Sequence, residues 1–172
     1  MKKDALIQAL QSCGALQRGH FVLTSGAISD YYIDIKKAST NPRVLKLIAQ
    51  HMTPFTKGYD LIAGMELGAV PLVVALSLET QIPYVIIRKQ KRDHGTGKQI
   101  EGPSVQQKRV LILEDVTTSG GSILQSIQIL KRNQAILEDV LVVVDRESGA
   151  REKIIDHGLE FHPLLTVEDI LS

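Results

Sequence analysis

Two adjacent carboxylates followed by hydroxyl and glycine residues are the most informative feature of this sequence. The apolar run VLIL at residues 110–113 ends at Glu114 and Asp115, and VTTSGGS follows at residues 116–122. A strand that leads through such a loop into a helix presents unpaired backbone N–H groups and the positive end of a helix dipole to an anion. The two glycines allow the backbone to approach that anion closely. Because the carboxylates cannot face a phosphate, their expected partners are ribose hydroxyls or a magnesium ion.

Other interpretations of this segment explain less of it. The sequence contains neither GxxxxGK[ST] nor GxGxxG, which disfavours a P-loop kinase and a dinucleotide-binding fold. The remaining alternative is an ordinary strand–turn–helix in which Ser119 is the N-cap. That alternative does not require paired acids directly before a loop of hydroxyls and glycines. We therefore interpret residues 110–122 as a binding site for a ribose phosphate.

A basic segment, RKQKRDHGTGK at residues 88–98, is the second candidate for chemistry. It holds five of the 20 Lys and Arg residues, together with His94 and a single acid, Asp93. A basic loop that contains glycines and follows a strand suits a lid that closes on an anion. Pyrophosphate is the natural candidate because negative charge builds on it as it leaves. The alternatives are a solvated surface loop and a nucleic-acid patch.

The elements expected around these segments alternate between strands and helices. Uninterrupted runs of Val, Ile and Leu imply strands that are buried on both faces, which predicts an α/β fold with a mostly parallel twisted sheet flanked by helices. In such a sheet, ligands bind at the carboxyl ends of the strands. We expect strands at residues 60–63, 84–87, 110–113, 140–144 and 161–165, two short strands within residues 21–35, and helices at residues 4–16, 42–52, 68–80, 119–132 and 150–157.

Length and composition fit one domain and exclude several classes of protein. The chain has 172 residues, of which 44% are hydrophobic and 23% are charged, as in ordinary globular proteins. The net charge of +1 gives no overall footprint for nucleic acid. The single Cys13 excludes an internal disulfide framework and suggests a reducing compartment. The longest apolar stretch, residues 70–78, is too short to span a bilayer, and the N-terminus lacks a signal-peptide pattern. We predict a cytoplasmic protein with no membrane or nucleic-acid partner.

Residues 110–122 resemble the phosphoribosyl-pyrophosphate (PRPP) signature of the type I phosphoribosyltransferases. The resemblance implies a type I phosphoribosyltransferase-like fold. It also implies that Glu114 and Asp115 hold the ribose 2′- and 3′-hydroxyls, while the following loop cradles the 5′-phosphate. The PRPP-binding residues implied by the resemblance are Arg88, Lys89, Arg92, His94, Glu114, Asp115, Val116, Thr117, Thr118, Ser119, Gly120, Gly121 and Ser122.

Three further segments resemble the orotate phosphoribosyltransferases in particular. Residues 88–95 are similar to the family's RKxxKxHG loop, although Arg92 stands where the family usually has Lys. Residues 21–34 resemble the N-terminal hood that covers the base, and Asp145-Arg146 matches the family's D-R pair. The resemblance implies that the catalytic residues are Lys89, Arg92, His94 and Asp115. It implies that the orotate-binding residues are Thr118, Arg146 and Tyr32.

Two departures from the family pattern concern PRPP and pyrophosphate. Thr24 occupies the position at which some members carry a Lys that touches PRPP. Residues 64–71 resemble the pyrophosphate loop, but Glu66 and Leu67 stand where some members have a Tyr-Lys pair. These changes leave the PRPP contacts more dependent on backbone groups.

The resemblance implies transfer of the phosphoribosyl group of PRPP to orotate, which gives orotidine 5′-monophosphate and pyrophosphate in de novo pyrimidine synthesis. It implies a Mg²⁺ cofactor held mainly by PRPP, and a homodimer whose basic loops reach into the partner's active site. We expect one domain over residues 1–172, with a hood at about 1–38 and a catalytic core at about 39–172. The alternatives are a purine or uracil phosphoribosyltransferase, and a PRPP-sensing regulator that does not catalyse.

Overall fold

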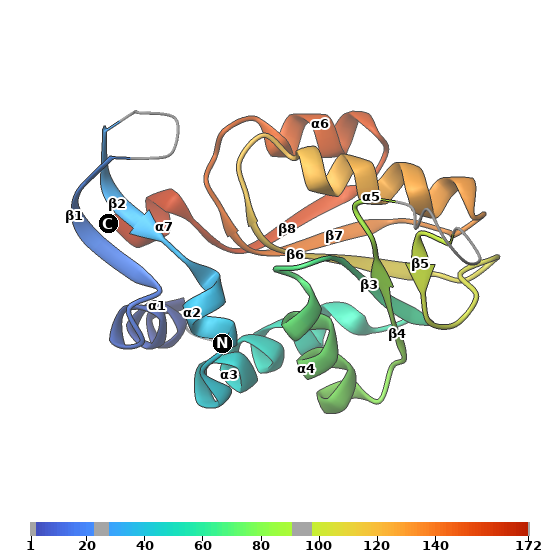
Figure 1. The fold of residues 1–172 in the computed structure, drawn as a ribbon, viewed down its shortest axis with the longest axis horizontal. Coiled ribbons are helices and arrows are strands. Elements are labelled where there is room, and N and C mark those ends of the chain that lie inside the picture. The colour runs from blue at the N-terminus through green and yellow to red at the C-terminus, as the bar shows by residue number, and fades with distance from the viewer. Residues whose placement is uncertain (1–2, 23–27, 91–97, 172) are drawn as a thin grey trace.

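A six-stranded sheet forms the centre of the protein (Figure 1), which we describe from a computed structural model covering residues 3–22, 28–90 and 98–171. The strand order is β5-β4-β3-β6-β7-β8, and every neighbouring pair is parallel except β4 and β5. This arrangement confirms the predicted α/β fold. The strands are β3 (Leu61–Met65), β4 (Tyr84–Ile87), β5 (Ile100–Glu101), β6 (Val110–Thr117), β7 (Asp139–Asp145) and β8 (Glu160–Thr166).

Helices cover both faces of the sheet, which is why its strands are apolar throughout. In Figure 1, α5 and α6 lie on one face, and α3 and α4 lie on the other. Alternate residues of β6 enter the two cores: Leu111 and Leu113 pack with α4, whereas Val110 and Ile112 pack with α5. The helices are α3 (Pro42–Met52), α4 (Val70–Thr80), α5 (Gly121–Arg132) and α6 (Ala150–Asp156), and the 3-10 helix η1 (Thr53–Thr56) follows α3.

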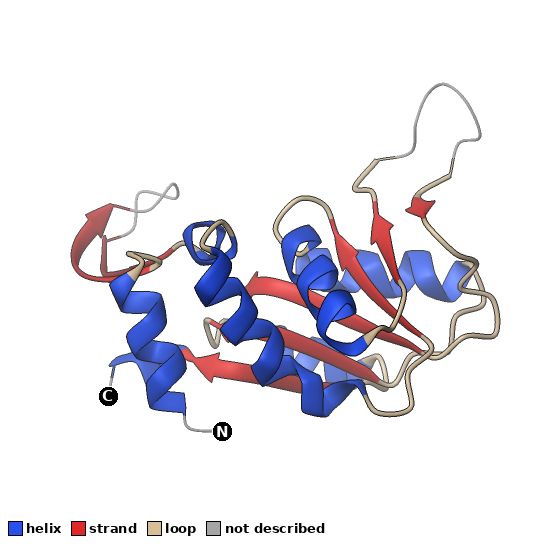
Figure 2. Cartoon of the chain, turned by 90° about the horizontal axis from the view of Figure 1, so that it is seen from below, coloured by secondary structure: helices blue, strands red, loops and turns tan. Residues whose placement is uncertain are grey.

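The N-terminal segment forms a small antiparallel sheet at one end of the molecule, and the β4–β5 pair lies at the other end (Figure 2). Helix α7 packs beside this small sheet and α1. The Arg18 guanidinium of β1 donates to the Ile170 carbonyl at 2.7 Å, and the Lys3 ammonium of α1 pairs with Asp169 at 2.7 Å. No helix in the described ranges is long and apolar enough to cross a membrane. The elements here are α1 (Lys3–Ser12), β1 (Leu16–Val22), β2 (Ile28–Ile33), α2 (Ile35–Ser39) and α7 (Val167–Leu171).

Several element boundaries differ from the expectation. The helix expected over residues 4–16 ends at Ser12, because Gly14 adopts a positive φ and the chain turns there into β1. The strand expected at residues 110–113 continues to Thr117 and so includes both carboxylates. The two-residue strand β5 was not predicted, since it is too short to produce a sequence pattern.

Candidate active site

The paired carboxylates lie in a pocket at the carboxyl ends of β3 and β6. The chain leaves β3 for β4 on one side and later returns to β6 on the other, so the strand order reverses between these two strands. Ligands of α/β sheets bind at such a switch point. The pocket has a volume of about 190 Å³ and is lined by Lys36, Met65, Glu66, Leu67, Gly68, Lys89, Glu114, Asp115, Val116 and Ser122.

Glu114 and Asp115 differ in burial. Glu114 is 7% exposed, and Asp115 is half-buried. Each carboxylate accepts a hydrogen bond from the N–H of the next residue, at 3.1 Å for Glu114 and 2.8 Å for Asp115. Burial, helped by the neighbouring Asp115, raises the pKa of Glu114 to about 8, while the nearby Lys89 opposes the shift. Burial therefore favours the protonated form of the Glu114 carboxyl, which can donate a hydrogen bond as well as accept one.

The loop after β3 packs closely against Asp115. A Cβ atom at Gly68 would overlap the Asp115 carboxylate, so only glycine leaves room for that carboxylate in its present position. The peptide between Glu66 and Leu67 is cis, and Leu67 is exposed. The segment that resembles the pyrophosphate loop thus lies in the pocket with the carboxylates, as its position after β3 predicts.

The loop after β6 has the geometry of an anion site. Gly120 adopts the left-handed conformation with φ of 81° and leads directly into α5. Ser119 is therefore not the N-cap, and α5 begins at Gly121 instead of residue 119. The first N–H groups of a helix have no partner within the helix, which leaves them available to a phosphate. Helix α6 supports the loop from outside, since the Lys153 ammonium donates to the Ser119 carbonyl at 3.0 Å.

The hydroxyl residues of this loop are not equivalent. Thr117 is buried, whereas Thr118, Ser119 and Ser122 are exposed. Ser122 lines the pocket, and its carbonyl accepts a hydrogen bond from the buried Ser126 hydroxyl at 3.0 Å. The exposed hydroxyls can donate to a ligand without losing a partner among the residues that the structure describes.

The root of the basic segment reaches the same pocket through Lys89. The Lys89 N–H donates to the Glu66 carboxylate at 2.9 Å, and its carbonyl accepts from the Gln125 amide at 2.9 Å. Arg88 does not line the pocket: its guanidinium lies 3.7 Å from the Glu101 carboxylate, and its buried Nε has no hydrogen-bond partner within the described ranges. Arg92 and His94 lie outside the described residues.

The residues predicted to bind orotate lie around the neighbouring end of β7. The Arg146 guanidinium lies over the Tyr31 ring, 5.3 Å from its centroid, and the Arg146 N–H donates to the Thr117 carbonyl at 2.9 Å. Tyr32 is 39% exposed and packs against Phe21, with ring centroids 5.6 Å apart. Neighbouring strand residues point to opposite faces, so Tyr31 is the tyrosine that contacts Arg146. The sequence analysis named only Tyr32.

Lys36 also lines the pocket and was missed by the sequence analysis. It lies in the first turn of α2, where the Asp34 carboxylate caps the helix by accepting from the Lys36 N–H at 3.1 Å. The signal in the sequence is the D-I-K segment at residues 34–36, which follows the two tyrosines after one isoleucine. Lys36 and Lys89 give the pocket two cations beside its carboxylates. Thr24, the position where some family members have a lysine, lies outside the described residues.

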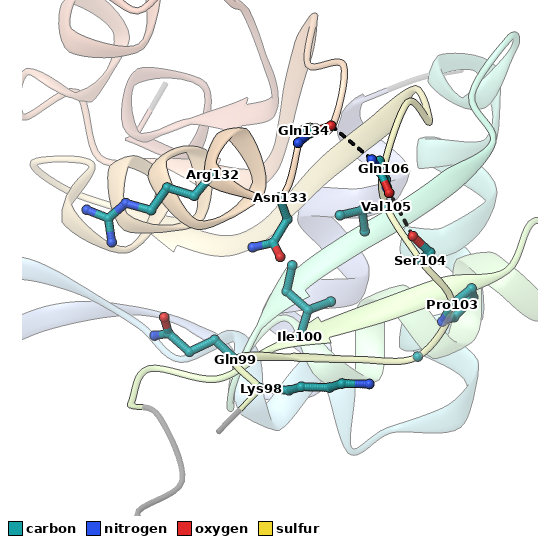
Figure 3. Close-up of a pocket in the computed structure, with 11 residues that line it drawn as sticks. Lys98, Gln99, Ile100, Pro103, Ser104, Val105, Gln106, Arg132, Asn133 and Gln134 are labelled. Atoms are coloured by element: carbon teal, nitrogen blue, oxygen red, sulfur yellow. Dashed lines mark hydrogen bonds between the residues drawn. The ribbon is translucent and has the colours of Figure 1, made fainter. Parts of the chain in front are cut away.

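The described residues also form a larger pocket, of about 420 Å³, away from these residues (Figure 3). It lies between the segment after the basic loop and the end of α5, and the Gln106 and Gln134 amides bond across it at 3.0 Å. The described residues that line it include no carboxylate, and Lys98 is the one residue among them that belongs to the basic segment. Because the predicted chemistry needs the paired carboxylates, we place the active site in the smaller pocket.

Comparison with known proteins identifies the family. The family model of the phosphoribosyl transferase domain matches residues 40–159. The orotate phosphoribosyltransferase of Pyrococcus abyssi is 50% identical, covering 99% of this chain and 96% of its own. The chain belongs to the orotate phosphoribosyltransferase family. The enzyme of that name from Methanocaldococcus jannaschii is 44% identical over 99% of this chain and 98% of its own.

Solved structures of orotate phosphoribosyltransferases agree with the fold. The Aeropyrum pernix enzyme has a TM-score of 0.85 and 30% identity, covering 96% of each chain. The Mycobacterium tuberculosis enzyme in complex with PRPP has a TM-score of 0.82 and 28% identity, covering 99% of each chain. The adenine phosphoribosyltransferase of Leishmania donovani, with a TM-score of 0.73 and 18% identity over 96% of this chain and 81% of its own, shares the fold alone. The family resemblance drawn from the sequence motifs is therefore confirmed.

Proposed function

We propose that this protein transfers the phosphoribosyl group of PRPP to orotate, which yields orotidine 5′-monophosphate and pyrophosphate in pyrimidine biosynthesis. One observation carries the proposal. The Glu114–Asp115 pair lies a few residues before the N-terminus of α5, whose N-cap is Gly120. Lys89 lines the same pocket as the two acids. This arrangement offers hydroxyl-binding, phosphate-binding and pyrophosphate-binding groups side by side, and relatives of 44% identity or more carry the corresponding enzyme name.

In this proposal, Glu114 and Asp115 bind the ribose hydroxyls. Both carboxyl groups offer oxygen atoms that can accept hydrogen bonds from the 2′- and 3′-hydroxyls. The 5′-phosphate binds at the start of α5, where the N–H groups of the first turn and the hydroxyls of Thr118, Ser119 and Ser122 are available. Both contacts fix the ribose while positive charge develops at its anomeric carbon, as in other glycosyl transfers.

Lys89 is proposed to neutralise the departing pyrophosphate, together with Arg92 and His94. Positioning and charge stabilisation are sufficient for this reaction, and no covalent protein intermediate is required. We also propose a homodimer in which the basic loop of one protomer completes the active site of its partner. The hood at about residues 1–38, the core at about 39–172 and a cytoplasmic location belong to the same proposal.

The residues of the pocket fit a magnesium ion that is held mainly by the substrate. Mg²⁺ binds proteins through one or two carboxylates and completes its shell with water and substrate phosphates. The described residues contain no group of three or more potential ligands that could hold a metal ion, whereas Asp115 offers a half-buried carboxylate in the pocket. When bound with PRPP, the ion would neutralise charge on the pyrophosphate.

Orotate is proposed to bind beside the ribose site, against Arg146 and Thr118, whereas Tyr32 points to the opposite face of the small sheet from Tyr31, which contacts Arg146. An arginine suits a planar anion with several oxygen acceptors, because its guanidinium donates in a fixed plane. The contact of the Arg146 guanidinium with the Tyr31 ring, 5.3 Å from its centroid, supports this placement, because it brings planar groups together at this edge of the site.

The test is the loss of orotate absorbance after the protein is mixed with PRPP and Mg²⁺, measured beside hypoxanthine, adenine and uracil. We expect turnover of orotate alone, with release of one pyrophosphate for each orotate consumed. Turnover of another base would reassign the substrate. Binding of PRPP by calorimetry without turnover of any base would indicate a PRPP-sensing regulator.

A further inference from the structure

The peptide of Lys89 is held on both sides by side chains from other elements. Its N–H donates to the Glu66 carboxylate at 2.9 Å, and its carbonyl accepts from the Gln125 amide at 2.9 Å. Glu66 comes from the loop after β3, and Gln125 lies on α5. Lys89 itself is exposed, so its peptide could bond to water instead. The protein nevertheless uses two side chains to fix it.

Glu66 extends the pairing of β3 and β4 beyond the ends of both strands. Its own N–H donates to the Ile87 carbonyl at 2.8 Å, which continues the parallel ladder by one bond. The next bond of the ladder, to the Lys89 N–H, is made by the Glu66 side chain. A hydrogen bond to a carboxylate is stronger than one to a neutral acceptor. The chain is thus fixed as far as Lys89, where the basic segment begins to leave the sheet.

A carboxylate such as Glu66 is poorly suited to contact the pyrophosphate of the substrate directly. Glu66 lines the pocket that also contains Glu114, Asp115 and Lys89. A carboxylate repels a pyrophosphate group at close range. Glu66 instead accepts a hydrogen bond from the backbone N–H of Lys89, so any effect of Glu66 on the reaction is exerted through Lys89.

We propose that Glu66 is a positioning residue for Lys89. Together with Gln125 it fixes the Lys89 peptide, and this directs the Lys89 ammonium into the pocket that holds Glu114 and Asp115. The inference rests on the proposed function of Lys89 at the leaving pyrophosphate. It predicts that Glu66 matters for turnover only as long as Lys89 is present.

Three variants separate the hydrogen bond from the charge. Glu66→Gln keeps a side-chain oxygen that can accept from the Lys89 N–H, so kcat should stay within about twofold of the wild type. Glu66→Ala removes the acceptor and should lower kcat about tenfold, with the KM for orotate changed less than about twofold. Gln125→Ala should lower kcat about threefold. The matched control is Glu160→Ala, an exposed glutamate at the amino end of β8, which should leave kcat unchanged.

A double-mutant cycle with Lys89→Met completes the test. We expect Lys89→Met to lower kcat about a hundredfold, and the addition of Glu66→Ala to lower it no further, because residues that act as a unit are not additive. Equal melting temperatures for the four proteins of the cycle would show that folding is intact. Additive losses, equal losses for Glu66→Gln and Glu66→Ala, or full activity of Lys89→Met would overturn the inference. Failure of the wild type to consume orotate would instead overturn the proposed function.

Discussion

The two ends of the central sheet both carry acidic residues, but they use them differently. At the carboxyl ends of the strands, Glu114 and Asp115 accept hydrogen bonds from the N–H groups that follow them and face a pocket. At the amino ends, Asp139 accepts from the Tyr59 hydroxyl and lies 2.6 Å from the His162 Nε2. Glu114 and Asp115 are left open to a ligand, whereas Asp139 of β7 links Tyr59, which precedes β3, to His162 of β8.

The two ends also differ in which groups have a shifted pKa. Burial raises the pKa of Glu114 to about 8, so the folded protein disfavours its charged form. At the opposite end, burial and the bond to Asp139 raise the pKa of Tyr59, which keeps the hydroxyl protonated as a donor. Buried polar groups that lack strong partners reduce stability, and groups that are satisfied maintain it. The carboxyl end is therefore organised for binding and the amino end for stability.

The largest expected effect comes from removing the acids at the open end. We predict that the double variant with Glu114→Gln and Asp115→Asn lowers kcat/KM about a thousandfold, because the ribose loses its hydroxyl partners in the transition state. Its melting temperature should equal or exceed that of the wild type. Steady-state kinetics and thermal unfolding of the same preparations measure both. A loss of activity below tenfold, or a large drop in melting temperature, would mean that these acids serve the fold.

The opposite end should give the reverse result. Asp139→Ala leaves the Tyr59 hydroxyl and the His162 ring without their acceptor, which should lower the free energy of unfolding by about 3 kcal/mol. At temperatures where the variant remains folded, kcat should stay within about twofold of the wild type. Denaturant unfolding together with kinetics at low temperature tests this prediction. Retained stability with impaired turnover would contradict the proposed division between the two ends.

The same comparison explains which features could be predicted from the sequence. The strand–loop–helix arrangement of residues 110–132 could be predicted because the strand, the acids and the loop are adjacent in the chain, and local order determines their placement. The start of α5 was placed two residues early because the left-handed Gly120 was not recognised as the N-cap. The contacts between Glu66 and Lys89 and between Tyr31 and Arg146 could not be predicted, since each joins elements that meet only in the folded sheet.

A smaller effect on activity is expected from one glycine beside the open acids. Gly68→Ala would place a methyl group against the Asp115 carboxylate, so the carboxylate must move, and we predict a loss of about thirtyfold in kcat/KM. Gly64→Ala is the contrasting variant, because its Cβ would lie 2.8 Å from Ala69 and from Val73 in the core. It should lower the free energy of unfolding by about 2 kcal/mol. Both variants need kinetics and denaturant unfolding; equal behaviour of the two would contradict the prediction.

The smallest expected effect is a pH dependence of stability that comes from Glu114. Its pKa is about 8 in the folded protein and has the ordinary carboxyl value of 4.5 in the unfolded chain. Between these values the folded state binds more protons than the unfolded state, so stability falls as the pH rises from about 5 to 8. We predict that Glu114→Gln reduces this fall by about 1 to 2 kcal/mol, with the nearby Lys89 limiting its size. Denaturant unfolding of both proteins at pH 5, 6.5 and 8, without PRPP, measures the difference. The control from the opposite end is Glu160→Gln, which removes an exposed carboxylate. Parallel stability curves for Glu114→Gln and the wild type would mean that Glu114 is ionised in the folded protein, and the open end would then hold two charged acids.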